Sequence, residues 1–416
     1  MSLWFSALTT NSDQNYRDRA LAAGHGCWVT DVRGRDYLDA RSALWHATLG
    51  YDNQNVIDAI TRQLHRLPIG QIIRHDQPPQ VDLDYADRLA AVLPQRLTHI
   101  RFCTTGAQAV EGAVLLSRFV NHRTHVIALW DGYHGIGGLA SSLTGEQPLH
   151  AIQGAPVGVH HVPAGDLDAL RDTVERVGPE RITAVLMEPI LGTGFVELGK
   201  SYLDAVAELC HRHGIHLILD EVTTGFGRSG SLTVAGALDV AADMVVLSKG
   251  ITAGYLPLAA IAVTAEIAGA AMSAGTLFPH GSTSDGHPLA IAAADAVLTE
   301  LTDGAVLARV ASIGAQLTDA VRERADDHPT IARVHGPGLM VAVSLVDTNG
   351  TPLAASAMAS VKDACRDAGL LVSLCGNMVM LTPPLIITEV EADLIADRLY
   401  DGILSVVSSG VLSRAA

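Results

Sequence analysis

The sequence predicts an α/β fold, with a large domain built on a mostly parallel central sheet and a smaller α+β domain formed by both termini. Three observations predict it. Short β-rich runs alternate with helix-length segments in the middle of the chain, the two ends follow other patterns, and 48% of the 416 residues are hydrophobic against 17% charged. Such a chain can bury a large core and does not resemble a disordered one.

The alternation runs from residue 101 to residue 263. The sequence predicts helices at 107–120, 166–177 and 202–213. It predicts strands at 101–104, 125–129, 182–187, 215–219, 244–247 and 258–263. Strands separated by helix-length segments are typical of a mostly parallel sheet that carries helices on both faces.

The two ends of the chain predict the smaller domain. Residues 27–38 alternate in a strand-like way, and the C-terminal part mixes hairpin-like runs with helical segments, at 333–346, 354–368, 370–381 and 389–407. We therefore expect residues 1–75 to form an N-terminal segment that is part of the small domain. Residues 76–305 would form the large, ligand-binding domain, and residues 306–416 the C-terminal small domain.

Charge and composition exclude several classes of protein. The formal net charge is −16 and no run of Lys or Arg occurs, so nucleic acid is not an expected partner. The most apolar stretch, residues 251–272, is interrupted by Gly254, Pro257 and Glu266 and predicts a buried strand followed by a helix start, not a membrane span. The N-terminus has no signal-peptide pattern, and the five scattered cysteines form no CxxC pair. We expect a soluble, cytoplasmic protein without a disulfide framework or zinc site.

The most informative residue is Lys249, one of only three lysines. Lys200 and Lys362 lie in segments that predict charged helix surfaces. Lys249 follows the apolar run 244–248 and precedes the small residues 250–254, which places its amine at the carboxyl end of a buried strand, where open α/β sheets bind ligands. A partly desolvated lysine has a lowered pKa and can attack an aldehyde. On position alone, a lysine that extends from the strand end into solvent fits equally well.

Asp220 ends a second apolar run, residues 216–219, and would lie at the same edge of the sheet. A buried carboxylate there could keep a proton on the ring nitrogen of pyridoxal phosphate (PLP), and that protonated ring acts as an electron sink. Val222 lies two residues further and would point the same way in an extended chain, against one face of the ring. An acid that caps the next turn is an equally good interpretation of Asp220 alone.

Two further segments could complete such a site. Thr105, Gly106 and Ala107 form a small-residue turn before a helix, where free N–H groups can bind phosphate, although an ordinary helix cap fits the same residues. Tyr133 follows the next strand and could stack on the other ring face, or it could be a core tyrosine. The pairs His160-His161 and His211/His213 lack a carboxylate or cysteine at ligand spacing, so we expect no metal.

Taken together, these segments resemble the class III aminotransferases, which are PLP enzymes of fold type I. The resemblance spans nearly the whole chain, and its most specific parts are residues 219–230, reading LDEVTTGFGRSG, and residues 247–250, reading LSKG. Further matches are Asp36-Tyr37-Leu38-Asp39, Thr105-Gly106-Ala107, Gly132-Tyr133-His134-Gly135, Glu188-Pro189-Ile190, Gly281-Ser282-Thr283 and Gly286-His287-Pro288. Leu44-Trp45 and residues 381–388 are most similar to the ω-amino acid:pyruvate branch.

The resemblance implies roles for these residues. Lys249 would form the Schiff base to PLP and Asp220 would hold the ring nitrogen. The remaining cofactor contacts would come from Thr105, Gly106, Ala107, Tyr133, His134, Glu188, Val222 and Thr283. By resemblance, Thr283 would reach the phosphate of the neighbouring subunit's cofactor, which implies a homodimer with its active sites at the interface.

Two positions depart from the family pattern. Gln108 stands where the family usually has Glu. Ser373 stands where many members have an arginine that binds the substrate carboxylate, and serine cannot make that bidentate contact. Either Arg74 or Arg41 substitutes for it, or the main substrate carries no carboxylate at that end. We expect Trp45, Arg74 and Ser373 near the substrate.

The expected reaction is a ping-pong transamination, in which an amine or amino acid donor gives its amino group to a keto or aldehyde acceptor. Lys249 would move the proton as general base. The first alternative is a PLP-dependent racemase or epimerase of the same fold, which no residue excludes. A catalytically silent PLP-fold protein that binds a partner is a second alternative, and the intact set of Lys249, Asp220 and Tyr133 argues against it.

Overall fold

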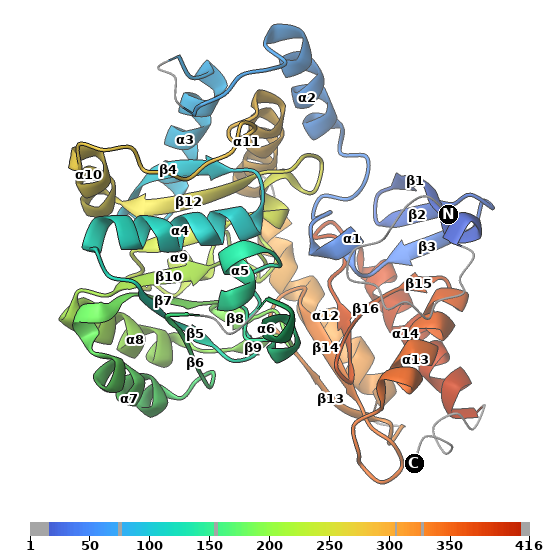
Figure 1. Cartoon of the computed structure of the whole chain (residues 1–416). Coiled ribbons are helices and arrows are strands. Elements are labelled where there is room, and N and C mark those ends of the chain that lie inside the picture. Colours follow the sequence, from blue (N-terminus) through green and yellow to red (C-terminus); the bar gives the residue numbers. More distant parts are fainter. Residues whose placement is uncertain (1–15, 74–76, 154–156, 304–305, 326–327, 409–416) are drawn as a thin grey trace.

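The computed structural model describes residues 16–73, 77–153, 157–303, 306–325 and 328–408. Its centre is a seven-stranded sheet (Figure 1). In spatial order the strands are β4 (Leu97–Cys103), β12 (Ala259–Thr264), β11 (Met244–Leu247), β10 (His216–Asp220), β7 (Ile182–Met187), β5 (His125–Leu129) and β6 (Val159–Val162). The predicted strands are all present, with ends that differ by a few residues.

The sheet is mostly parallel, as predicted, and β12 is its exception. Strands β11, β10, β7, β5 and β6 run parallel to one another, whereas β12 is antiparallel to both β11 and β4. The chain reverses between β11 and β12 within residues 248–258, where Ala253 and Gly254 have positive φ. So short a connection cannot return the chain for a parallel crossover, which needs a dozen or more residues.

Helices cover both faces of the sheet because alternate residues of each buried strand point to opposite faces. On one face, Val126, Leu186 and Ile218 pack with α4 (Gly106–Asn121). On the other face, Ile127, Val185 and Leu217 pack in the cluster that contains α7 (Leu167–Val177) and α8 (Lys200–His213). Every residue of β7, β11 and β12 is buried, which explains why these strands read as continuous apolar runs.

The two ends of the chain build two smaller sheets on the other side of the molecule (Figure 1). One contains β1 (Leu21–His25), β2 (Trp28–Asp31), β3 (Asp36–Asp39) and β15 (Leu370–Leu371), and the other β13 (Ile331–His335), β14 (Val341–Leu345), β17 (Met378–Leu381) and β16 (Ser373–Cys375). Because β15 pairs in parallel with β3, the N-terminal and C-terminal segments share one sheet. The helices α13 (Ala355–Asp367) and α14 (Glu389–Ser408) pack on each other beside it.

The remaining elements connect these layers. The helices are η1 (Tyr16–Arg19), α1 (Ser42–Trp45), α2 (Gln54–Arg66), α3 (Gln80–Val92), α5 (Gly138–Leu143), α6 (Gln147–Gln153), η2 (Pro179–Arg181), α9 (Val234–Ala237), η3 (Lys249–Thr252), α10 (Ala265–Ser273), α11 (Pro288–Asp303) and α12 (Val306–Ala325). Two short strands, β8 (Ile190–Leu191) and β9 (Val196–Glu197), form a hairpin. Within the described ranges, no helix combines the length and the hydrophobicity that crossing a membrane requires.

Candidate active site

A cavity of about 380 Å³ lies at the carboxyl edge of the large sheet. Asp220 ends β10, and Lys249 comes two residues after the end of β11. The cavity is lined by both residues and by Gly106, Ala107, Tyr133, His134, Glu188 and Val222. The structure therefore brings together eight of the ten residues that the sequence predicts at the cofactor.

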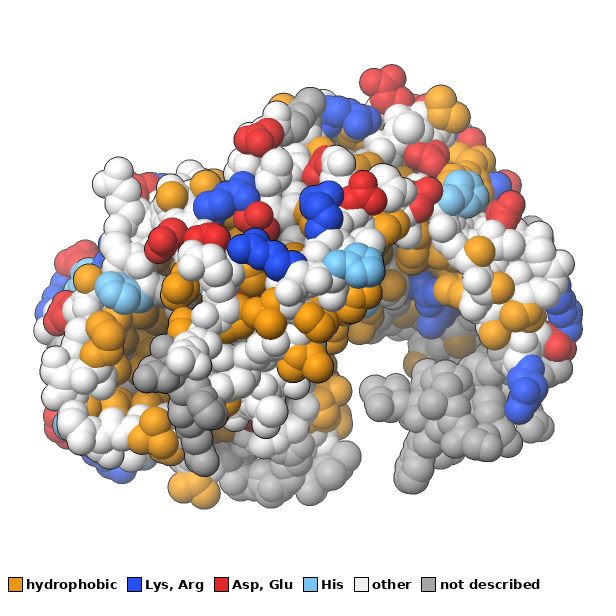
Figure 2. All heavy atoms as spheres, turned by 90° about the horizontal axis from the view of Figure 1, so that it is seen from above, with side chains coloured by type: hydrophobic (Ala, Val, Ile, Leu, Met, Phe, Trp, Pro, Cys, Tyr) orange, Lys and Arg blue, Asp and Glu red, His pale blue; other side chains and the backbone are white. Residues whose placement is uncertain are grey.

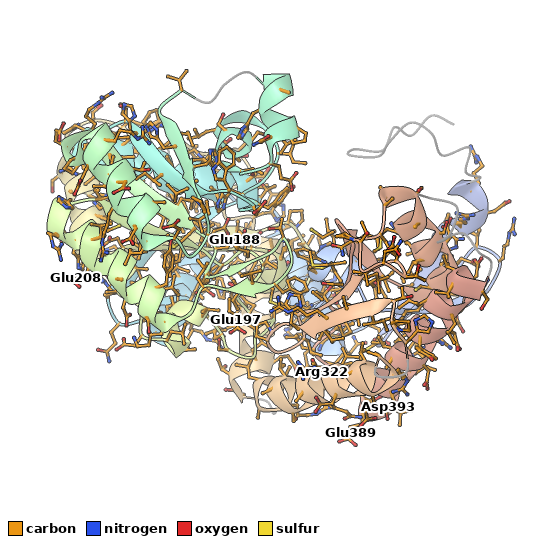
Figure 3. The ribbon with its side chains drawn as sticks, turned by 90° about the horizontal axis from the view of Figure 1, so that it is seen from below. Glu188, Glu197, Glu208, Arg322, Glu389 and Asp393 are labelled. Atoms are coloured by element: carbon orange, nitrogen blue, oxygen red, sulfur yellow. The ribbon has the colours of Figure 1, made fainter. Side chains whose placement is uncertain are left out.

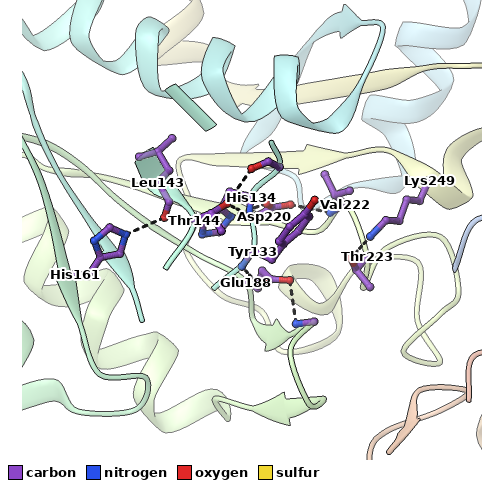
Figure 4. A network of polar contacts seen from close by, with 12 residues as sticks. Tyr133, His134, Leu143, Thr144, His161, Glu188, Asp220, Val222, Thr223 and Lys249 are labelled. Atoms are coloured by element: carbon purple, nitrogen blue, oxygen red, sulfur yellow. Dashed lines mark hydrogen bonds and ion pairs between the residues drawn. The ribbon is translucent and has the colours of Figure 1, made fainter. Parts of the chain in front are cut away.

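Lys249 contributes a partly buried amine to this cavity. Its Nζ donates a hydrogen bond of 2.6 Å to Thr223 Oγ1 and lies 4.7 Å from the centre of the Trp45 ring (Figure 4). The pKa of Lys249 is lowered to about 8, chiefly by burial and also by the charge of Arg228, which together outweigh the raising effect of the Glu188 and Asp220 carboxylates. About a tenth of the amine is thus uncharged at pH 7, far more than for a surface lysine, as a nucleophile requires.

Asp220 is almost fully buried and is held by His134. The Nδ1 atom of His134 lies 2.7 Å from Asp220 Oδ2, while Asp220 Oδ1 accepts a hydrogen bond of 3.0 Å from the backbone N–H of Val222 (Figure 4). Burial disfavours a charged imidazole, but the hydrogen bond and charge of Asp220 outweigh it and raise the pKa of His134. His134 and the Val222 N–H therefore hold the Asp220 carboxyl group in a fixed position at the wall of the cavity.

The start of α4 forms the next wall. Thr105 Oγ1 caps the helix by accepting from Gln108 N, and the first-turn N–H groups have no acceptor within the helix. Glycine suits position 106, because a Cβ atom here would lie 3.0 Å from Val222 Cγ1 and would force that side chain to shift. Its small size lets the helix start approach Val222 closely, beside the cavity.

Gln108 links the turn between β4 and α4 to Asp285 through hydrogen bonds. Its Oε1 accepts from the backbone N–H of Thr104, and its Nε2 donates to both carboxylate oxygens of Asp285, at 3.0 and 3.3 Å. A glutamate at position 108 could not donate to that carboxylate. The amide therefore suits the buried acid that this chain has at position 285.

Glu188 lies on the opposite side of the cavity and orders Tyr133. Its two carboxylate oxygens accept hydrogen bonds from the backbone N–H groups of Tyr133 (2.9 Å) and Gly192 (3.0 Å). Burial raises the pKa of Glu188 to about 7. Figure 3 shows Glu188 in the interior between the two parts of the chain, whereas Glu208 and Glu389 project from the outer surface.

The terminal parts of the chain close the cavity. Leu44 and Trp45 come from the N-terminal part, and Leu374 and Cys375 come from β16. Ser42, Ala43 and Trp45 have positive φ, a strained conformation that non-glycine residues rarely adopt. Trp45, predicted near the substrate, therefore reaches the cavity from a strained loop.

Other predicted residues lie elsewhere. Thr283 is exposed and does not line the cavity of its own chain. Ser373 lies at the start of β16, next to the lining residues Leu374 and Cys375 but not among them. Thr105 precedes the lining residue Gly106, and Arg74 falls outside the described residues.

Sequence reasoning missed several residues of the site. Thr223 was within the most specific motif, but its contact with Lys249 had no signal of its own. Glu146, Thr193, Leu374 and Cys375 line the cavity without belonging to any recognisable pattern. Their places depend on how distant segments pack.

The residues present fit PLP. An amine, a buried carboxylate fixed by an imidazole, a helix N-terminus with free N–H groups, an aromatic ring and an aliphatic side chain converge on one cavity. These are the groups that could hold an aldehyde, a ring nitrogen, a phosphate and two ring faces. In the described chain no group of three or more His, Cys, Asp or Glu could hold a metal ion.

Comparison with known proteins agrees with this geometry. The sequence profile of the family described as aminotransferase class-III matches residues 10–403. An acetylornithine aminotransferase of Mycobacterium tuberculosis is 37% identical over 381 residues, which cover 90% of this chain and 89% of that protein. An omega-aminotransferase of Caulobacter vibrioides is 30% identical and is matched over 94% of this chain and 95% of its own length.

Solved structures show the same fold. An amine transaminase from an uncultivated Pseudomonas species, solved in a PLP-bound form, superimposes with a TM-score of 0.91. It is 32% identical, and the match covers 97% of this chain and 99% of that one.

Proposed function

The chain belongs to the class III aminotransferases and is a PLP-dependent transaminase of fold type I, and on that premise we propose which residues act and which donor it takes. When bound, PLP supplies the electron sink that lets an amino group leave one carbon and join another. We propose that Lys249 is the covalent anchor of the cofactor and that Asp220 holds the proton of its ring nitrogen.

The other roles follow from the walls of the cavity. His134 holds Asp220 in position, and the free N–H groups at the start of α4, around Thr105, Gly106 and Ala107, bind phosphate. Tyr133 and Val222 bracket the ring, and Glu188 orients Tyr133 through its backbone. Lys249 Nζ removes the proton from the amine-bearing carbon of the donor, and its lowered pKa supports that role. The two half-reactions then follow a ping-pong order.

We propose that the preferred amino donor is a primary amine without a carboxylate near the reacting carbon. The observation that carries this proposal is that none of the described residues lining the cavity is an arginine. Its substrate side instead offers Leu44, Trp45, Leu374 and Cys375, with the carboxylate of Glu146 exposed at the rim. Such walls favour an apolar or cationic donor and disfavour an anionic one.

The test follows the visible absorption of the PLP-loaded protein while donors are added one at a time. We expect 1-phenylethylamine and butane-1,4-diamine to abolish the yellow band at lower concentrations than β-alanine, and pyruvate to restore it. The Lys249→Ala variant should not complete this cycle. A stronger response to β-alanine would contradict the proposed donor class, and normal turnover by the variant would contradict the role of Lys249.

We also propose a homodimer in which Thr283 of each chain reaches the partner's cofactor phosphate. Two observations support this proposal. The first is that Thr283 is exposed. The second is that large apolar side chains are exposed, with exposed fractions of 63% for Leu277 and 71% for Met272, which are near Thr283 in sequence, and 76% for Ile69 in the segment after α2. Figure 2 shows hydrophobic side chains gathered between charged ones on the upper face of the molecule. Sedimentation should give the mass of two chains, and Thr283→Ala should weaken PLP binding without dissociating them.

The proposal also covers the domain boundaries of the chain and its location in the cell. We propose domains at residues 1–75 with 306–416 and at 76–305, because the seven-stranded sheet lies within residues 97–264 and β15 joins the two ends. A cytoplasmic location is supported by the five cysteines, which are all free thiols.

A further inference from the structure

A second cavity, of about 180 Å³, lies among the terminal segments and carries an unusual charge. Among the described residues, four cationic side chains and no acidic one line it: the cations are Arg19, Arg41, Lys362 and Arg366. The chain has only 28 Lys and Arg against 44 Asp and Glu, so such a grouping stands out. Like charges placed together are unfavourable unless an anion joins them.

The contacts around the cavity leave part of this charge available. Within the Arg41 guanidinium, only Nε has a partner among the described residues, Asp39 Oδ1 at 3.2 Å, and Arg366 pairs with Asp363 and Asp367 on its own helix. Lys362 has no ion-pair or hydrogen-bond partner among the described residues. Burial and then the charge of Arg41 lower the pKa of Lys362, as expected of an ammonium that faces other cations.

The remaining walls are apolar and rigidly held. The other described lining residues are Leu21, Tyr37, Leu370, Leu371 and Val372, where β15 pairs with β3 and α13 packs on β15, side by side in Figure 1. Tyr37 is fixed by a hydrogen bond of 2.9 Å from its hydroxyl to Asp31. A ligand here would meet both cationic and hydrocarbon groups.

We propose that this cavity binds the phosphoryl group of a small molecule, either free phosphate or a phosphate ester with an apolar body. Several cations around one small cavity match a multivalent oxyanion better than a single carboxylate. Arginine offers planar pairs of donors to phosphate oxygens, and lysine adds a point charge. The site is separate from the cofactor cavity, with which it shares no lining residue.

The test is isothermal titration calorimetry on PLP-loaded, desalted protein at low ionic strength, with inorganic phosphate and phenyl phosphate as probes. Because the cofactor's own phosphate already fills the first site, we expect one further equivalent per chain. Tighter binding of phenyl phosphate would identify an ester ligand, and equal binding would identify free phosphate. Added NaCl should weaken both.

The decisive variant is Lys362→Gln, with Lys200→Gln as the matched control, since Lys200 also lies on a helix but is paired with Asp204 outside the cavity. We expect Lys362→Gln to weaken phosphate binding by about tenfold or more, since a charge-assisted hydrogen bond is lost. Lys362→Arg and Lys200→Gln should bind as the wild type does. Unchanged thermal unfolding would show that the Lys362→Gln variant folds. No heat from either probe, or equal affinity in Lys362→Gln, would overturn the proposal.

Discussion

At the scale of single residues, the proposed chemistry depends on whether the amine of Lys249 is charged. Burial lowers its pKa to about 8 from the usual 10.5, so the uncharged form dominates above pH 8. We therefore expect the rate at which cofactor-free protein takes up PLP to rise with pH, with a midpoint near 8. The rate is measured from the growth of the visible band after mixing, between pH 6 and 10.

One result would contradict the expected pH dependence of PLP uptake. A midpoint near 10.5 would mean that Lys249 is solvated like a surface lysine and that its position in the cavity is wrong. The Lys249→Arg variant is the control, because a guanidinium stays charged throughout this range and cannot attack the aldehyde. It should show no band at any pH.

His134 offers a second prediction at this scale. Replacing it with Phe removes the donor to Asp220 Oδ2 and leaves a buried carboxylate with only the Val222 N–H as partner. We expect the free energy of unfolding to fall by about 2–4 kcal/mol and kcat to fall by about tenfold, because the loss of one partner of a buried charge pair is strongly destabilising. Chemical denaturation and steady-state kinetics measure the two effects.

The loss should depend on pH in a defined direction. The pKa of His134 is raised in the fold above its usual 6.5, so its contribution is fully present below pH 6.5 and declines as the pH rises through the raised value. The matched control is His161→Phe, since His161 bonds Leu143 O and stacks on Trp130 outside the cavity. A loss that is equal in both variants would contradict a specific role for His134.

Single residues were predictable where the chain offers few alternatives. Lys249 stood out because only three lysines exist, and Asp220 because it ends an apolar run. The contact of His134 with Asp220 was not predictable, since 86 residues separate them and only the order of β5 and β10 in the sheet brings them together. The contact of Thr223 with Lys249 could not be predicted for the same reason.

At the scale of elements, the turn from β4 to α4 depends on Gln108. Replacing it with Glu would place a carboxylate against Asp285, which is buried and already accepts from Gln108 and Ser282. We expect a loss of about 1–3 kcal/mol in the free energy of unfolding and weaker PLP binding at neutral pH. Denaturation and PLP titration measure these effects.

The chain supplies a matched control for this substitution. Gln80 Nε2 donates to Asp84 in the same way, at 2.7 Å, but on an exposed helix surface, so Gln80→Glu should change stability little. The penalty in Gln108→Glu comes from repulsion between two carboxylates, so it should be smaller in acid than at neutral pH. A penalty that persists in acid would point to packing instead of charge.

Helices and strands were predicted well where apolar residues are regularly spaced, and poorly where tertiary packing decides the local structure. Six of the seven strands of the large sheet and the helices α4, α7 and α8 were predicted within a few residues, whereas β6 and the shorter helices α5, α6 and α9 were not predicted. The direction of β12 was not predicted, because an apolar run of six residues reads the same in both orientations. The helices α2, α3, α11 and α12 were not predicted either, and they lie on either side of the predicted alternation.

At the scale of the whole molecule, the active site exists only where three parts of the chain meet. Its floor comes from the edge of the large sheet, and its substrate side from Leu44 and Trp45 near one end and from Leu374 and Cys375 near the other. The sequence identified the floor, since each strand end carries its own motif. The substrate side could not be assigned, because it is set by how β16 and the loop before Trp45 pack against the large sheet.

Arg228 is the residue that holds these three parts together. It is fully buried, and its guanidinium donates to Ser42 Oγ (3.2 Å), Leu339 O (3.2 Å) and Pro383 O (2.5 Å). No carboxylate of the described chain pairs with it, and burial lowers its pKa to about 9. Replacing it with Met should cost about 3–5 kcal/mol of unfolding free energy, since it removes three hydrogen bonds and leaves buried acceptors without a donor.

The same substitution should also reach the cofactor site through charge. Arg228 helps to lower the pKa of Lys249, so its loss should move the midpoint of PLP uptake above 8 in whatever protein remains folded. The control is Arg171→Met: Arg171 lies on α7, where it pairs with the exposed Asp168, and its loss should have little effect on either quantity. If the variant is less stable but the pH midpoint of PLP uptake does not shift, then Arg228 only joins the three parts of the chain. If the midpoint does shift in the protein that remains folded, then Arg228 also helps to set the pKa of Lys249.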